Sequence, residues 1–203
     1  MTIKVCGMKH ALNIRELDTL QLADWMGFIF YPGSPRFVDQ VPQYLPQYSK
    51  RVGVFVNEPT DDIVRRLHEF GLDMVQLHGD ESPGYCQDLK QMFGPVPLIK
   101  AISVSSKADL RRAEAYTDIA DYLLFETPCQ GFGGSGHKFD WSILQAYQGP
   151  TPFLITGGIG PDDIERIRAF SHPHCIGFDL NSRFETAPAI KDIAALAAFI
   201  KVL

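Results

Sequence analysis

The chain has 203 residues, of which 45% are hydrophobic and 21% charged, and its net charge at pH 7 is −5. This length and composition fit one globular domain over residues 1–203 with a substantial hydrophobic core. The negative charge argues against nucleic acid as the main partner, although a local positive pocket could still bind a small anion.

The chain also lacks the usual sequence marks of export and of metal binding. The N-terminus carries no apolar signal-peptide core and no apolar run approaches 18 residues, so we expect a cytoplasmic protein with no membrane partner. The cysteines Cys6, Cys86, Cys129 and Cys175 are scattered, with no CxxC pair. This spacing predicts reduced thiols rather than disulfides or a zinc site.

Short apolar runs recur along the chain and indicate buried strands. They span residues 3–8, 25–30, 51–57, 74–79, 97–102, 121–126, 153–158 and 176–180. Helices are expected near residues 14–20, 60–70, 83–92, 107–116, 140–147, 161–170 and 188–200. Thr60 can cap one of them, and Ile190 should face inward with Ile193 and Ile200 in the last. Pro42 and Pro46 leave at most a short or broken helix around residues 38–48.

The strands are continuous apolar runs rather than alternating ones, as parallel strands covered by helices require. Eight strand–helix units in a chain of 203 residues predict a single (βα)8 TIM barrel, in the α/β class. A doubly wound open sheet is the alternative fold. That fold would normally show a phosphate-binding loop after the first strand, where this chain has Cys6, Gly7 and Met8.

Polar side chains stand at the ends of the predicted strands, where this fold gathers its functional groups. They are Cys6, Arg36 just beyond the second strand, Asn57, His78, Lys100, Glu126, Thr156, Asp179, Asn181 and Ser182. Taken singly, such a residue is more often a loop anchor, and a lone cysteine is usually a small buried hydrophobe. The set matters more, because the fold brings its members to one rim.

Glycines mark two further places. Gly157 and Gly158 follow the seventh strand, and the loops after strands seven and eight hold phosphate in many barrels of this fold. We prefer this interpretation to a simple tight turn. Residues 131–136 are also rich in glycine but lack the Lys-Ser/Thr pair of a P-loop, so they indicate a lid over the site or a solvated loop.

The residues match a known family over nearly the whole chain. The matching stretches are residues 4–8, 27–36, 52–57, 75–81, 133–136, 139–141, 157–158 and 190–192. The chain therefore resembles phosphoribosylanthranilate isomerase, an enzyme of tryptophan and hence aromatic amino-acid biosynthesis. The resemblance implies a phosphosugar substrate, N-(5-phosphoribosyl)anthranilate, which is converted to 1-(2-carboxyphenylamino)-1-deoxyribulose 5-phosphate.

The resemblance also implies roles for the strand-end residues. In this Amadori rearrangement Cys6 is the general base that removes the proton from the sugar C2, and Glu126 is the general acid that opens the furanose ring, without metal or organic cofactor. Arg36 holds the anthranilate carboxylate, Asp179 tunes the acidic end of the site, and His78 shapes the rim. The phosphate-binding residues are Gly157, Gly158, Asn181 and Ser182. A thiolate base requires a lowered pKa and a carboxylic acid donor a raised one.

Two departures from the family pattern leave alternatives open. Glu126 stands where the family usually has aspartate, and Arg183 replaces the glycine of a usual Ser-Ser-Gly. A non-catalytic barrel that binds a phosphosugar is one alternative. Another is an aldolase or epimerase, which would need metal ligands or a Schiff-base lysine, and Lys100 is the only strand-end lysine on strands four to eight. The oligomeric state, monomer or homodimer, stays open.

Overall fold

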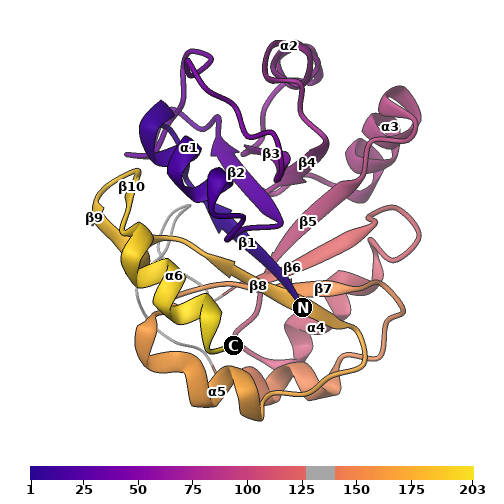
Figure 1. Ribbon diagram of the computed structural model, residues 1–203. Helices are drawn as coiled ribbons and strands as arrows, with labels where there is room; N and C mark the ends of the chain where they lie inside the picture. Colours follow the sequence, from indigo (N-terminus) through magenta and orange to yellow (C-terminus); the bar gives the residue numbers. More distant parts are fainter. Residues whose placement is uncertain (127–139) are drawn as a thin grey trace.

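The computed structural model describes residues 1–126 and 140–203. Eight parallel strands close into a barrel in sequence order, with the last strand paired to the first (Figure 1). The strands are β1 (Thr2–Cys6), β2 (Trp25–Ile29), β3 (Lys50–Phe55), β4 (Met74–Leu77), β5 (Leu98–Ser103), β6 (Tyr122–Glu126), β7 (Phe153–Ile155) and β8 (Cys175–Leu180). The predicted TIM barrel is confirmed, and closure of β1 on β8 excludes the open sheet.

Helices surround the barrel and connect its strands (Figure 1). They are α1 (Ala11–Thr19), α2 (Thr60–Phe70), α3 (Pro83–Phe93), α4 (Lys107–Glu114), α5 (Ile164–Ala169) and α6 (Ile193–Lys201). Three 3₁₀ segments, η1 (Trp141–Ala146), η2 (Pro161–Asp163) and η3 (Ser182–Phe184), and a hairpin of β9 (Glu185–Ala187) and β10 (Ile190–Lys191) complete the described elements. No helix forms over residues 38–48, which agrees with the two prolines there.

Three sequence-based expectations about helices are wrong. The last helix begins at Ile193 instead of residue 188, because Asp192 caps it by accepting a hydrogen bond from the backbone N–H of Ala195 at 2.9 Å. The preceding hairpin turns through Ala189, whose φ of 65° no helix contains, and Ile190 is 40% exposed rather than inward. Thr60 is already the first residue of α2 and caps nothing with its side chain.

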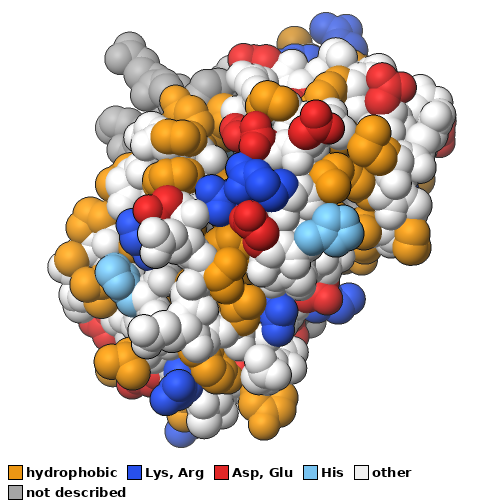
Figure 2. Space-filling view, turned by 90° about the horizontal axis from the view of Figure 1, so that it is seen from above, with side chains coloured by type: hydrophobic (Ala, Val, Ile, Leu, Met, Phe, Trp, Pro, Cys, Tyr) orange, Lys and Arg blue, Asp and Glu red, His pale blue; other side chains and the backbone are white. Residues whose placement is uncertain are grey.

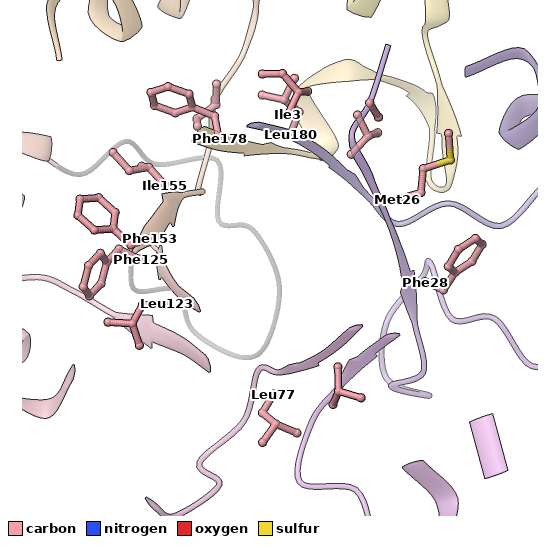
Figure 3. Packing of buried hydrophobic residues seen from close by; sticks show 14 of the residues in the cluster. Ile3, Met26, Phe28, Leu77, Leu123, Phe125, Phe153, Ile155, Phe178 and Leu180 are labelled. Carbon is pink, nitrogen blue, oxygen red and sulfur yellow. The ribbon is translucent and has the colours of Figure 1, made fainter. Parts of the chain in front are cut away.

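Side chains alternate between the two faces of each strand, so position along the strand decides what enters the barrel. The inward apolar layer consists of Trp25, Val52, Met74, Ile99, Ala101, Leu124 and Leu154. The outward side chains of the same strands, among them Phe28, Leu77, Phe125 and Phe178, lie around the ring of strands in Figure 3 and pack under the helices. Most inward positions nearest the carboxyl ends of the strands are polar, with Ile29 of β2 and Val54 of β3 as apolar exceptions, and together they line the site described below.

The outer surface carries charges of both signs. On the face shown in Figure 2, Lys and Arg side chains lie directly beside Asp and Glu side chains. Over residues 1–126 and 140–203, no helix is long and apolar enough to cross a membrane.

Candidate active site

One cavity lies among the carboxyl ends of the strands, and every residue predicted to form the site lines it. They are Cys6, Arg36, His78, Glu126, Gly157, Gly158, Asp179, Asn181 and Ser182. Thr156 lines the cavity as well, whereas Asn57 and Lys100, two other strand-end residues, do not. The barrel therefore gathers onto one rim residues that are up to 176 positions apart, Cys6 and Ser182 being the extremes.

Cys6 points into the barrel beside a buried ion pair. Lys4 precedes it by two residues on β1 and so shares its face, and Lys4 Nζ lies 3.0 Å from Asp179 Oδ1. Both charged side chains are at most 5% exposed. Asp179 thus belongs to the end of the site that holds the thiol, which differs from its expected place at the acidic end.

The thiol is held close to its neighbouring strand. Cys6 pairs in register with Gly27 on β2, and a Cβ at position 27 would lie only 2.7 Å from Cys6 Sγ. The glycine therefore provides the space that the sulfur occupies.

Burial and the neighbouring cations act in opposite directions on Cys6. Burial, together with the negative charge of Asp179, raises the pKa of the Cys6 thiol, while the ammonium groups of Lys4 and Lys191 lower it, and the net direction is upward. The positive neighbourhood required for a thiolate base is present, but desolvation outweighs it.

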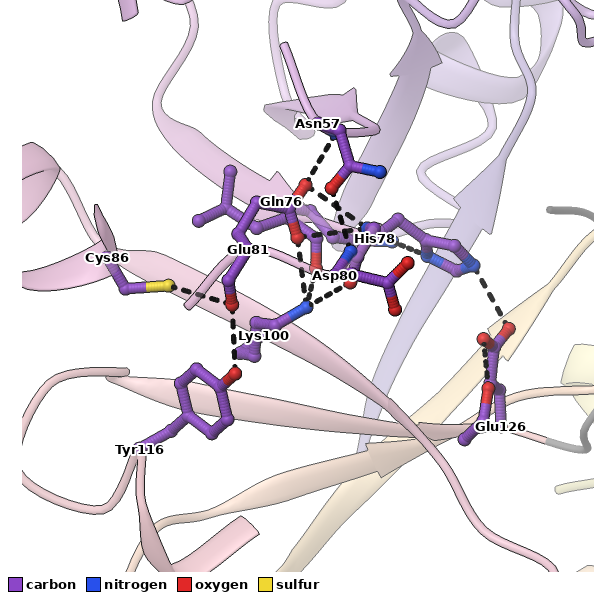
Figure 4. Close-up of polar contacts among 12 residues, drawn as sticks. Asn57, Gln76, His78, Asp80, Glu81, Cys86, Lys100, Tyr116 and Glu126 are labelled. Carbon is purple, nitrogen blue, oxygen red and sulfur yellow. Dashed lines mark hydrogen bonds and ion pairs between the residues drawn. The ribbon is translucent and has the colours of Figure 1, made fainter. Parts of the chain in front are cut away.

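Glu126 ends β6 and takes part in a chain of hydrogen bonds that crosses the rim (Figure 4). His78 Nε2 lies 3.0 Å from Glu126 Oε2, and Gln76 Nε2 lies 2.8 Å from His78 Nδ1. Because the Gln76 amide nitrogen can only donate, His78 Nδ1 accepts and its Nε2–H is directed at Glu126. Ser103 Oγ donates to the second carboxylate oxygen at 2.9 Å.

These contacts set the direction of the Glu126 pKa. Burial raises the pKa of Glu126, but the electrostatic interaction and hydrogen bond with the His78 ring, followed by the hydroxyl of Ser103, lower it below its ordinary value. This is the opposite of the raised pKa that a carboxylic acid donor requires.

The loop after β4 that carries His78 is anchored from behind by a buried ion pair (Figure 4). Lys100 Nζ lies 3.0 Å from Glu81 Oε2 and donates to the backbone oxygen of Gly79 at 2.7 Å. Glu81 in turn accepts from the backbone N–H groups of Asn57 and Gly79, at 2.8 and 3.0 Å. Lys100 shares its strand face with Leu98 and Ile102 of the outer core, so it points away from the cavity. Lys100 and Asn57 are therefore loop anchors.

Backbone geometry at the seventh strand end suits an anion. Gly157 and Gly158 have φ of 100° and 66°, and no described residue accepts a hydrogen bond from either N–H. The Gly160 N–H, by contrast, is bound to Asp163 Oδ2 at 2.8 Å, and η2 and α5 are short, so a helix N-terminus adds little here. The Arg183 side chain is exposed and packs on Gly160, which puts a positive charge beside these loops.

Asn181 and Ser182 form the other side of this end of the cavity. Asn181 Oδ1 accepts a hydrogen bond from Lys191 Nζ at 2.7 Å, and Ser182 begins η3. The side-chain carbonyl is therefore turned towards a buried ammonium group, and the Asn181 amide nitrogen is the atom that remains for a ligand.

Arg36 already has a protein partner. Its Nε donates to Glu185 Oε1 and Oε2 at 2.9 and 3.1 Å, and its Nη2 donates to Oε2 at 2.6 Å. The side chain passes over Gly7, where a Cβ would lie 2.5 Å from Arg36 Cδ and where φ is 78°. Arg36 lines the cavity, but only part of its guanidinium remains for a ligand.

Sequence reasoning missed several of these groups. Lys4 could have been found, since a charged residue on a buried strand two positions before Cys6 must share its face. Glu185 gave no such signal, because it lies 149 residues from Arg36 in the chain. Cys86 and Cys175 are free thiols, as predicted, and burial raises the pKa of each to about 11. Cys129 and the glycine-rich stretch 131–136 lie outside the described residues.

Comparison with known proteins identifies the family. A sequence model described as N-(5'phosphoribosyl)anthranilate (PRA) isomerase matches residues 3–202. An N-(5'-phosphoribosyl)anthranilate isomerase of Phocaeicola vulgatus is 49% identical over 203 residues, which cover 100% of this chain and 98% of that protein. The crystal structure of phosphoribosyl anthranilate isomerase from Thermus thermophilus superposes with a TM-score of 0.84 at 26% identity, covering 100% and 98% of the two chains.

A further solved structure of a phosphoribosyl anthranilate isomerase contains reduced 1-(o-carboxyphenylamino)-1-deoxyribulose 5-phosphate. It is 28% identical, has a TM-score of 0.78, and the match covers 99% of this chain and 97% of that one. The chain belongs to the N-(5'-phosphoribosyl)anthranilate isomerase family.

Proposed function

We propose that this chain isomerises N-(5'-phosphoribosyl)anthranilate by general acid–base catalysis, with Cys6 as the base and Glu126 as the acid. The observation that carries the proposal is their common cavity: Cys6 enters it from β1 and Glu126 from β6, which are not neighbouring strands. A substrate bound between them would meet a thiol on one side and a carboxyl on the other.

The polar ends of the cavity match the two anionic groups of this substrate. Gly157 and Gly158 offer backbone N–H groups for the phosphate, and Arg36 offers a guanidinium edge for the anthranilate carboxylate. The ligand named for the related solved structure carries both a phosphate and a carboxyphenyl group, which supports a phosphosugar of this kind.

In the proposed sequence, Glu126 gives its proton to the furanose ring oxygen, and the ring opens to a Schiff base. Cys6 then takes the proton from the sugar C2, and the resulting enolamine becomes the ketone of the product. His78 holds the Glu126 carboxyl in place through its Nε2–H.

This sequence uses a minority protonation state of the enzyme. With the pKa of Cys6 raised and that of Glu126 lowered, most molecules near neutral pH hold a thiol and a carboxylate. The active form holds a thiolate and a carboxylic acid. It carries the same number of protons, so its fraction does not change between the two pKa values.

The aldolase alternative loses its main support in this structure. A Schiff-base lysine would have to reach the cavity, and Lys100 points outward into the ion pair with Glu81. A non-catalytic phosphosugar-binding barrel remains the competing proposal, and turnover separates it from an isomerase.

Steady-state kinetics on N-(5'-phosphoribosyl)anthranilate tests the proposal. We expect Cys6→Ala and Glu126→Gln each to lower kcat by at least about a hundredfold, the lower range for loss of a general base or acid. Glu126→Asp should keep substantial activity, because it retains the carboxyl group. Cys175→Ala is the matched control, since Cys175 begins β8 at the opposite end of the barrel.

Two results would overturn this proposal. A folded wild-type protein that binds the substrate without turnover would make the chain a binding barrel. Nearly full kcat in folded Cys6→Ala or Glu126→Gln would remove that residue from the mechanism.

A further inference from the structure

The hairpin of β9 and β10 places a buried carboxylate directly behind Arg36. Glu185 begins β9, and both of its oxygens accept hydrogen bonds from the Nε and Nη2 of Arg36, at 2.6 to 3.1 Å. The Glu185 side chain is 5% exposed and does not line the cavity, whereas Arg36 does. The guanidinium thus stands between the carboxylate and the cavity.

Glu185 is itself held in place from several directions. Lys191 Nζ donates to Glu185 Oε1 at 2.6 Å, and the backbone N–H of Ala189 donates to the same oxygen at 3.2 Å. The Lys191 side chain is fully buried, and its backbone N–H and C=O both bond to the Asn13 side chain on α1, at 2.7 and 3.0 Å. The hairpin lies close to α1 and α6 in Figure 1. The carboxylate therefore has one fixed position.

The geometry of the guanidinium leaves one edge for a ligand. Arg has five N–H donors in a rigid plane, and a carboxylate that takes Nε and one Nη occupies one edge of that plane. The other edge consists of Nη1 and the second N–H of Nη2. Among residues 1–126 and 140–203, no acceptor bonds to Nη1 of Arg36.

We propose that Glu185 is a positioning residue that orients Arg36, so that its free Nη1/Nη2 edge receives the carboxylate of the substrate. This inference rests on the proposed function, in which Arg36 binds the anthranilate carboxylate. Lys191 completes the arrangement by fixing Glu185.

A competing role for Glu185 would be to block Arg36 until substrate displaces it. The burial of Lys191 opposes that role, because moving Glu185 away would leave a fully buried ammonium group without its carboxylate. The carboxylate therefore stays with both cations while the free edge of Arg36 is used.

A double-mutant cycle tests the inference. The variants are Glu185→Gln, Arg36→Lys and the two combined, and kcat and KM are measured for N-(5'-phosphoribosyl)anthranilate, together with the inhibition constant of inorganic phosphate. We expect Glu185→Gln to raise KM about tenfold, to change kcat less, and to leave phosphate inhibition nearly unchanged. Because Glu185 acts through Arg36, the double variant should have nearly the KM of Arg36→Lys alone.

The matched control is Glu69→Gln on α2, which removes a carboxylate from an ion pair with Arg65 and Arg66 on the outer surface. Its KM should equal that of the wild type. Glu185→Asp is the second variant. It keeps the charge but is too short for both bonds, and it should raise KM less than Glu185→Gln does. If Glu185→Gln fails to fold, Glu185→Asp carries the test.

The outcomes separate this inference from the proposed function. Suppose first that Arg36→Lys raises KM. An unchanged KM in folded Glu185→Gln or Glu185→Asp then overturns the positioning role alone. The same holds if the effects of Glu185→Gln and Arg36→Lys on KM are additive in the double variant. An unchanged KM in Arg36→Lys overturns the carboxylate site itself, and with it this inference.

Discussion

Replacing Gly27 with alanine should displace the proposed base without removing any of its atoms. Gly27 pairs with Cys6 between β2 and β1, and its missing side chain faces the sulfur. A Cβ built there would lie 2.7 Å from Cys6 Sγ and 3.1 Å from Cys6 Cα, where ordinary contacts begin at 3.4 Å. Since one of the two atoms belongs to the backbone of β1, a rotation of the thiol alone cannot relieve the overlap.

The structure sets the size of the effect. Overpacking a core by one methyl group costs about 1–3 kcal/mol, and a domain of this size loses about 2–4 °C in Tm for each kcal/mol. We therefore expect Tm to fall by about 2–12 °C. A displacement of about 1 Å at a reacting group can lower a rate about a hundredfold, so kcat should fall by about ten- to a hundredfold in the folded variant.

Thermal unfolding and steady-state kinetics measure both effects, and Gly84→Ala is the control. Gly84 lies in the first turn of α3, where a Cβ would meet only Ser82 Oγ at 4.0 Å. Alanine there should keep kcat and leave Tm equal or slightly higher, because alanine favours helix. Wild-type Tm and kcat in Gly27→Ala would refute the reasoning, since Cys6 could then move at no cost.

Two further predictions concern pH. The plot of kcat/KM against pH should be a broad plateau. Activity should fall on the acid side at a pH below the ordinary carboxyl pKa, because of Glu126, and on the alkaline side at a pH above the ordinary thiol pKa, because of Cys6. An alkaline fall that begins below about pH 7 would contradict the raised pKa of Cys6. Asp109 at the start of α4 accepts hydrogen bonds from the backbone and hydroxyl groups of Ser105 and Ser106, which lower its pKa to about 2. Its contribution to stability is therefore complete above its unfolded pKa of about 3.9 and is lost as pH falls towards 2. Asp109→Asn should lower Tm at pH 7 by about 1–4 °C, since the carboxylate contributes about 0.5–1 kcal/mol to stability. In thermal unfolding at about pH 2 the difference in Tm from the wild type should disappear. An equal difference in Tm at both pH values would contradict this assignment.

The barrel could be predicted from the sequence because two signals indicate its strands, an apolar run and the type of residue at which the run ends. Each is a continuous apolar run, and several end at a glycine or a polar residue, as β1 does at Cys6 and Gly7. Alternation along the strand then decides which strand-end residues reach the cavity. The same rule could have excluded Lys100 from the cavity, because Lys100 shares its strand face with Leu98 and Ile102. Applying the rule requires knowing which face of the strand points inward, and the composition of the strand does not tell this.

The rest of the site depends on contacts that no local pattern encodes. The sequence predicts too early a start for the last helix, because the apolar spacing continues from Ile190 into α6. In the structure a positive φ at Ala189 and the cap at Asp192 prevent the helix from extending back to residue 188. The pairing of Arg36 with Glu185 joins residues 149 positions apart. Nor does the residue type of Cys6 or Glu126 give the direction of its pKa, which results from burial opposed by particular neighbours.

The presence of buried charged side chains around Cys6 is better explained by the proposed chemistry of the site than by the stability of the fold. Buried ion pairs such as Lys4–Asp179 and Lys191–Glu185 usually add little stability compared with apolar side chains of similar size, because desolvation offsets the attraction. With Arg36, the group holds three cations and two carboxylates, which leaves one net positive charge against the thiol. The three cations each interact electrostatically with Cys6. A surplus positive charge among buried side chains favours both a thiolate and a bound carboxylate, and the proposed reaction requires one of each.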